Sequence, residues 1–146
     1  MEWNKFEPLK ITTPDEIILS AINGFTEATK NLADMLLLEK SEQARINSKL
    51  YTNFQYELIL HSKYINGYNF LLLEVGYDIT IYPATIFLEI DIHDEINNTF
   101  TLEKKTTVIK DEEEFKKTLQ LVFQTDRFKK LVSGVMKLAS KELSDF

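Results

Sequence analysis

The sequence lacks cysteine altogether and has little histidine, glycine or proline. Without cysteine there is no disulfide framework, no thiolate metal site and no cysteine nucleophile. Two histidines cannot supply a three-histidine zinc site, and no glycine-rich phosphate loop, G-x-S-x-G or H-E-x-x-H motif occurs. Nucleotide-binding and zinc-protease functions therefore have no motif to support them, and we expect no cofactor.

Long hydrophobic runs are also missing. No apolar stretch approaches eighteen residues, and Glu2, Lys5 and Glu7 interrupt the segment where a secretory signal would need an unbroken apolar run. These features predict a cytoplasmic protein that does not associate with membranes. At 146 residues and 44% hydrophobic composition, the chain can bury one continuous core, so we expect residues 1–146 to form a single domain.

Negative charge is concentrated in the middle of the chain. The formal net charge is -6, and residues 51–99 alone carry seven acidic residues against the single base Lys63. Such a field repels nucleic acid and attracts basic partners. The alternative is that the acidic residues serve only solubility.

The first helix signal is a capping box. In Thr13-Pro14-Asp15-Glu16, Thr13 can cap, Pro14 suits the first helical position and Glu16 completes the box. Apolar residues then recur at helical spacing, which predicts helical structure over residues 13–50 after an extended arm, 1–12. We expect a bend at Ser41, which can cap a second short helix from Glu42 to about Leu50, because an unbroken helix of about 55 Å would exceed the domain.

From residue 54 the apolar pattern changes to a period of two, which indicates strands. Asn66-Gly67 predicts a two-residue hairpin turn that pairs Ile65 with Tyr68, and therefore Leu58 with Val75. A third strand is expected over about residues 79–93 and a fourth over about 100–109. The prediction is thus a four-stranded antiparallel meander over residues 54–109.

Two further helices are predicted at the C-terminal end, over residues 111–143. Asp111 can cap the first of them, and the acidic residues that follow it favour a helix N-terminus. Asp126 can cap the second. The overall fold class is therefore α+β, with helices on both sides of the sheet in sequence.

Aromatic and acidic residues of the predicted sheet form the candidate contact surface. In a strand over 79–93, Phe87, Glu89 and Asp91 would point from one face. Tyr68 and Phe70 would lie on the mixed face of the hairpin, and all six tyrosines fall between residues 51 and 82. Tyrosine is enriched at protein interfaces, although strands favour aromatics as well. These five residues are the predicted partner-binding set.

A metal-dependent alternative uses overlapping residues. Asp91, His93 and Glu103 are candidate metal ligands, because hard cations prefer oxygen clusters. With Glu103-Lys104-Lys105 twelve residues beyond Asp91, the set Asp91, Glu103 and Lys105 resembles the D and E-x-K elements of the PD-(D/E)xK nucleases. That resemblance, which lacks the Pro-Asp pair, implies that the acids hold magnesium and the lysine helps to activate water.

The sequence favours a non-catalytic protein-binding or inhibitor module of the immunity, antitoxin or anti-defence type. It would use the acidic, aromatic sheet surface against a basic protein partner, without binding nucleic acid. A small magnesium-dependent hydrolase is the alternative, and a homodimeric chaperone or scaffold is a further one.

Overall fold

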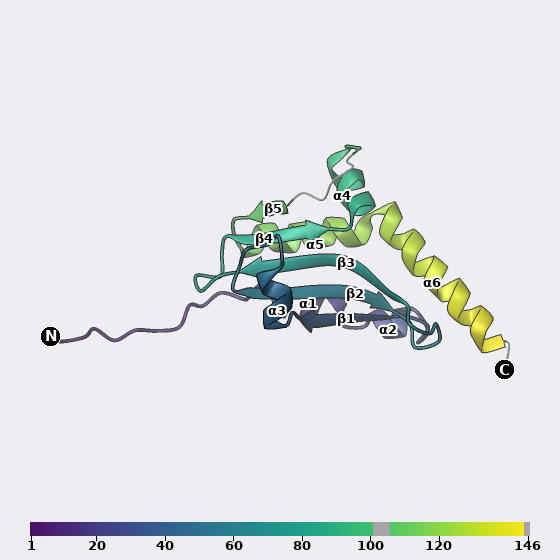
Figure 1. Cartoon of the computed structure of the whole chain (residues 1–146), viewed down its shortest axis with the longest axis horizontal. Helices are drawn as coiled ribbons and strands as arrows, with labels where there is room; N and C mark the ends of the chain where they lie inside the picture. The colour runs from purple at the N-terminus through teal and green to yellow at the C-terminus, as the bar shows by residue number, and fades with distance from the viewer. Residues whose placement is uncertain (101–105, 145–146) are drawn as a thin grey trace.

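The computed structural model describes residues 1–100 and 106–144, which form an α+β fold. The five strands make one antiparallel sheet in the order β1-β2-β3-β4-β5 (Figure 1). The elements are α1 (Pro14–Ile22), α2 (Phe25–Ala28), β1 (Asp34–Glu39), α3 (Glu42–Ile46), β2 (Phe54–His61), β3 (Asn69–Tyr77), β4 (Ala84–Leu88), α4 (Ile90–Asn97), β5 (Thr106–Ile109), α5 (Glu112–Gln124) and α6 (Asp126–Ser144).

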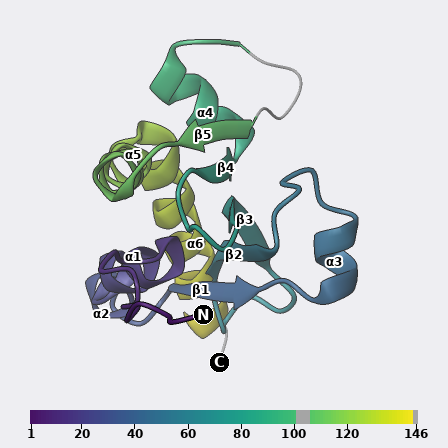
Figure 2. The same ribbon diagram turned by 90° about the vertical axis from the view of Figure 1, so that its left-hand side faces the viewer.

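The sheet lies between two unequal layers. Helices α1, α2, α5 and α6 are on one side, which we call the helix-covered face, and α3 lies on the other side, the second face (Figure 2). Helix α4 follows β4 at one corner of the sheet, and the first residues of the chain extend away from the body (Figure 1). In the part of the chain that the structure describes, no helix combines the length and hydrophobicity needed to cross a bilayer.

The predicted helical region 13–50 is only partly correct. The capping box at Thr13 and Glu16 is confirmed, with the Thr13 backbone N–H donating to Glu16 Oε1 at 3.4 Å. The helix ends at Ile22, however, and residues 34–39 form the edge strand β1, so the sheet has five strands instead of four. The reason is local: Gly24, Lys30 and Asn31 have positive φ angles, which end the two short helices.

The short helix predicted after Ser41 begins where it was expected, but it is shorter than predicted. The Ala44 N–H donates to Ser41 Oγ at 3.2 Å, so Ser41 caps α3 as expected. Helix α3 ends at Ile46, because the chain then turns back over the second face. A Cβ on Gly76 of β3 would lie 2.1 Å from Thr52 Oγ1, which shows how closely residues 50–52 approach the sheet.

The predicted hairpin turn is present but its strand register is wrong. Tyr68 N donates to Ile65 O at 3.3 Å across Asn66-Gly67, yet a second turn from Ser62 to Ile65 widens the connection. Leu58 therefore lies opposite Leu73 instead of Val75. A shift of two residues keeps the same faces, so Leu58 and Val75 still share the helix-covered face, and both are fully buried.

The predicted third strand over 79–93 is also too long. Strand β4 ends at Leu88, and Glu89 caps α4 by accepting a hydrogen bond from the Ile92 N–H at 2.9 Å. Phe87, Glu89 and Asp91 consequently do not share one strand face. Of the predicted fourth strand over 100–109, the described part is β5, and residues 101–105 lie outside the described residues.

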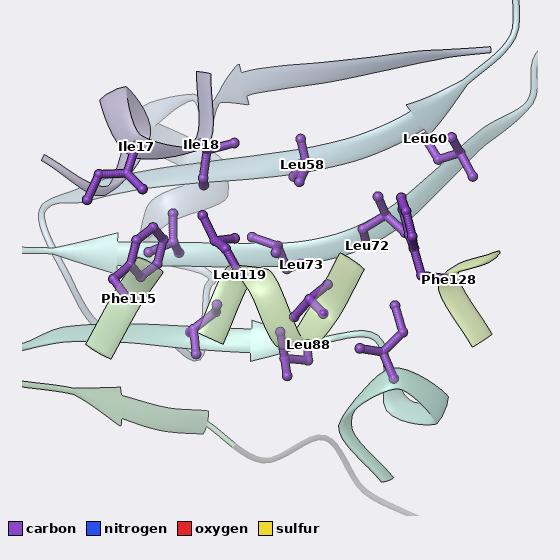
Figure 3. Close-up of a cluster of buried hydrophobic side chains, with 14 of the residues drawn as sticks. Ile17, Ile18, Leu58, Leu60, Leu72, Leu73, Leu88, Phe115, Leu119 and Phe128 are labelled. Atoms are coloured by element: carbon purple, nitrogen blue, oxygen red, sulfur yellow. The ribbon is translucent and has the colours of Figure 1, made fainter. Parts of the chain in front are cut away.

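The C-terminal helices agree closely with the prediction. Asp111 caps α5 by accepting from the Glu114 N–H at 2.9 Å. The cap of α6 is Thr125 instead of Asp126, because the Phe128 N–H donates to Thr125 Oγ1 at 3.1 Å. The core lies between the helix-covered face and these helices, and the labelled side chains of Figure 3 come from α1, the sheet, α5 and α6. They include Ile18, Leu58, Leu73, Phe115 and Phe128.

Candidate functional site

Three of the five predicted contact residues meet around one arginine that the sequence did not indicate. Arg127, in the first turn of α6, lies 3.0 Å from Glu89 Oε1 and 3.4 Å from Asp91 Oδ2, measured from its Nη2. Its guanidinium carbon is 5.7 Å from the centre of the Phe70 ring. We call these four residues the Arg127 corner. It joins the start of β3 and the start of α4 to α6.

The carboxylates of the Arg127 corner differ in exposure. Glu89 is mostly buried, since its side chain is 11% exposed and one oxygen caps α4 while the other accepts from Arg127. Asp91 is 60% exposed and lies on the rim. Glu89 is therefore part of the fold, whereas most of the Asp91 side chain is exposed.

Glu95 provides a second link between α4 and α6. Its two carboxylate oxygens accept the backbone N–H groups of Asp126 and Arg127 at 2.7 and 2.9 Å. A carboxylate at this position satisfies otherwise free amide groups and suits the positive end of the α6 dipole. Glu95 thus holds the first turn of α6, and with it Arg127, in place.

A groove of about 790 Å³ runs between α4 and α6 beside this corner. Acidic side chains line the α4 side, whereas the α6 side carries three basic side chains and the acidic Asp126. The lining residues are Asp91, Glu95, Asp126, Arg127, Lys129, Lys130 and Ser133. The groove is open and lined mainly by charged side chains, which is typical of a surface that meets another macromolecule rather than of an enclosed ligand pocket.

The other two predicted contact residues lie elsewhere. Phe87 is 6% exposed and belongs to the second face, in a hollow of about 350 Å³ below α3 that is also lined by Glu57, Glu74 and Lys40. It cannot serve as an exposed anchor. Tyr68 is half-buried in the β2–β3 connection, two residues before Phe70. The structure therefore brings Phe70, Glu89 and Asp91 together and separates Phe87 from them.

The hollow below α3 was not anticipated from the sequence. Glu57 and Glu74 are direct cross-strand partners, and the Lys40 ammonium forms an ion pair with Glu74. Two opposed carboxylates destabilise a sheet unless a cation lies between them, so Lys40 has a structural role here. Lys40 lies in the segment that was predicted to be helical, and a helix there would not place it beside Glu74.

The candidate metal set is not assembled among the described residues. His93 Nδ1 lies 3.3 Å from Asp94 Oδ1, and Asp91 is turned toward Arg127. Because residues 90–97 are helical, Asp91 and His93 do not project from one face as a strand would require. Glu103 and Lys105 lie outside the described residues. Elsewhere in 1–100 and 106–144, no three histidine or carboxylate side chains are placed to hold a metal ion.

Comparison with protein-family models, curated proteins and solved structures finds no match to this chain.

The N-terminal arm is a further exposed feature. Trp3 and Phe6 are 77% and 78% exposed, and their ring centres lie 6.4 Å apart. The arm joins the body at Thr12, whose carbonyl accepts from the Tyr82 hydroxyl at 3.2 Å. Burial raises the pKa of Tyr82 to about 12, so this hydroxyl stays protonated and can donate. Large exposed apolar side chains are typical of interaction sites.

Arg127 could have been noticed from one local signal. A base in the first turn of a helix is unfavourable beside the helix dipole, unless carboxylates from other elements lie nearby. Those partners are Glu89 and Asp91, which are more than thirty residues away in sequence. Only the fold could identify them.

Replacing Arg127 by methionine is expected to weaken the α4–α6 contact while keeping the aliphatic part of the side chain. Glu89 would lose its charged partner but keep its bond to the Ile92 N–H. We expect a loss of about 1–2 kcal/mol in the free energy of unfolding, because the pair is partly solvated. Urea unfolding would measure it. Lys130→Met, in the same helix turn, is the control, and an equal loss for both variants would contradict the assignment.

Proposed function

We propose that this chain is a cytoplasmic, non-catalytic protein-binding module of the immunity, antitoxin or anti-defence type. The observation that supports this proposal best is the convergence of Phe70, Glu89 and Asp91 at the Arg127 corner, next to an open groove. An exposed carboxylate beside a partly exposed aromatic ring resembles the rim and centre of a protein interface.

The carboxylates on the α4 side of the groove favour a partner that presents basic groups there. Glu89, Asp91 and Glu95 place three carboxylates on the α4 side, and Arg127 is the one cation among the described residues that contacts Glu89 and Asp91. Asp91 lies at the rim, where a lysine or arginine of the partner can approach it. The bases Lys129 and Lys130 line the other side of the groove. A fitting partner therefore presents a basic group toward α4 and an acidic one toward α6.

The aromatic contribution comes from Tyr68 and Phe70 in this proposal. Both are half-buried at the β2–β3 end of the sheet, whereas Phe87 is covered from the second face. The exposed Trp3 and Phe6 of the arm support the same general function, because they offer apolar surface that the described residues leave uncovered.

The hydrolase alternative receives less support. A magnesium ligand should face other oxygens, and Asp91 faces the guanidinium of Arg127. A fixed cation at 3.4 Å from a carboxylate oxygen disfavours binding of a second cation there. No observation among the described residues favours this alternative over protein binding.

The proposal predicts a salt-dependent association rate. After the partner has been identified by pull-down from the native host, its association with Asp91→Asn can be followed by stopped-flow at several ionic strengths. We expect the variant to associate roughly twofold to fivefold more slowly than wild type at low salt and equally fast at high salt, because a rim carboxylate mainly steers encounter.

Glu42→Gln is the matched control, since Glu42 is an exposed acid of α3 on the second face. It should associate as fast as wild type at every salt concentration. If Asp91→Asn associates at the wild-type rate in low salt, or if both variants slow the reaction equally, the Arg127 corner is not the contact surface.

A further inference from the structure

The free edge of β1 is the strongest feature that the proposed function does not use. Strand β1 pairs with β2 on one side, and none of the described residues forms a strand on its other side (Figures 1 and 2). Proteins usually protect such edges with lysine, proline, a bulge or a covering element. Within Asp34–Glu39 there is no lysine or proline, and its pairing with β2 shows no register shift.

The backbone groups that point out of this edge can be identified. The Lys40 N–H donates to Gln55 O at 2.9 Å, and hydrogen-bonded residues alternate along an antiparallel pair. Asp34, Leu36 and Leu38 therefore face β2, whereas the N–H and C=O groups of Met35, Leu37 and Glu39 point outward. The hydrogen bonds of the described residues include no partner for these outward groups. The edge thus offers three donors and three acceptors at regular spacing.

We propose that two copies of this chain pair through β1 in antiparallel fashion and form one continuous sheet. A twofold axis perpendicular to the sheet puts the cores of both copies on the same side. Each residue of β1 must then face a residue of the second copy whose side chain points to the same side of the sheet, so odd-numbered residues face odd-numbered ones and even-numbered residues face even-numbered ones. Placing Leu37 opposite Leu37 of the second copy satisfies this condition. Met35 then lies opposite Glu39, and the outward backbone groups of both strands pair with each other.

The side chains in this register are self-complementary. On the second face, Leu36 lies opposite Leu38 of the second copy, and the two are 37% and 47% exposed in the single chain. Asp34 lies opposite Lys40 of the second copy, whose ammonium is buried and paired with Glu74 of its own chain, so the register brings no acid against Asp34. Like charges do not face each other at any position of β1. The same register covers the exposed leucines and opposes no like charges, which is the argument for a second copy as the occupant.

Helix α6 extends toward the same side of the molecule. Its last turns lie beyond the level of β1 in Figure 1, and they carry the exposed Leu138 and Leu143. A six-residue seam alone is smaller than a standard interface of about 800 Å² per partner. Contacts from the end of α6 would enlarge it, and the association should depend on protein concentration.

The oligomeric state tests the proposal directly. Light scattering coupled to size-exclusion chromatography, from micromolar to near-millimolar protein, should show wild type shifting from monomer toward dimer. Leu38→Lys should remain monomeric at every concentration, because it places a charge in the seam. The monomer itself should tolerate this lysine, because Glu57, the cross-strand partner of residue 38 on β2, can form an ion pair with it. Leu121→Lys, on an equally exposed leucine of α5, should dimerise like wild type.

A disulfide test checks the register. The chain has no cysteine, so the double variant Leu36→Cys, Leu38→Cys introduces only the pairs that face each other across the seam. Such non-hydrogen-bonded pairs bring Cα atoms to about 4.5 Å, which suits a disulfide. Mild oxidation should give a covalent dimer for the double variant and much less for either single variant. A wild type that stays monomeric, a dimer unaffected by Leu38→Lys, or equal cross-linking of the single variants would overturn the proposal.

Discussion

Phe115→Ala is expected to lower the free energy of unfolding by about 3–5 kcal/mol, the range for an aromatic residue removed from a core. Phe115 is fully buried and is the largest of the completely buried side chains. It lies in the first turn of α5, beside Ile17 and Ile18 of α1 (Figure 3). Its removal therefore leaves a cavity between two helices and the sheet, which the rigid sheet cannot fill.

Leu121→Ala provides the control for this substitution. Leu121 is on the same helix and 50% exposed, so its truncation should cost less than about 1 kcal/mol. Urea unfolding followed by circular dichroism measures both values. A loss below about 2 kcal/mol for Phe115→Ala would mean that α5 does not pack on α1 as described.

The predictable parts of this fold are those determined by neighbours in sequence. The capping residues Thr13, Ser41 and Asp111 act on amide groups three residues away, and all three were identified from the sequence. The turn at Asn66-Gly67 is local too, and it is present. Where a side chain acts within one helical turn, its identity and its spacing in the sequence are sufficient to predict the local structure.

The failures occur where a tertiary contact decides between two local possibilities. Residues 34–39 contain a continuous apolar run, which fits a buried helix or a strand equally well. Pairing with β2 buries Met35 and Leu37 against the core, and this decides for the strand. The register between β2 and β3 was wrong for a similar reason. The bulge beside Leu58 turns both Leu72 and Leu73 into the core, and a period of two cannot predict it.

In the candidate site, too, residue types could be predicted from the sequence, but the tertiary contacts between them could not. Phe70, Glu89 and Asp91 were chosen for aromatic and acidic character, and they do come together, but through Arg127 instead of a shared strand face. Phe87 was placed on the correct face relative to its neighbours Ile86 and Leu88. However, that face is covered by α3 and the segment after it, and the prediction had assigned α3 to the helical region 13–50.

The segment after α3 gives the second large expected effect. Gly76→Ala should lower the free energy of unfolding by about 2–3 kcal/mol, because the new methyl group has no space. A Cβ at Gly76 would lie 2.1 Å from Thr52 Oγ1, 3.2 Å from Thr52 Cβ and 3.3 Å from Leu50 Cβ. The first contact involves the end of a short, branched side chain, and the other two involve atoms attached directly to the backbone. The whole segment would therefore have to move.

Thr52→Ala separates the steric cause from any other effect of Gly76→Ala. It removes Oγ1, and with it the shortest contact and the hydrogen bond from that hydroxyl to Phe54 O, but leaves the Cβ contact at 3.2 Å. In a double-mutant cycle the two substitutions should thus be coupled, with Gly76→Ala costing at least 1 kcal/mol less in the Thr52→Ala background, about what relief of one clash provides. Gly134→Ala is the matched control, since a Cβ at Gly134 meets no atom within 4 Å and lies in α6, where alanine favours the helix. Independent costs for Gly76→Ala and Thr52→Ala would show that residues 50–52 do not lie against β3, and that the second face of the sheet is open there.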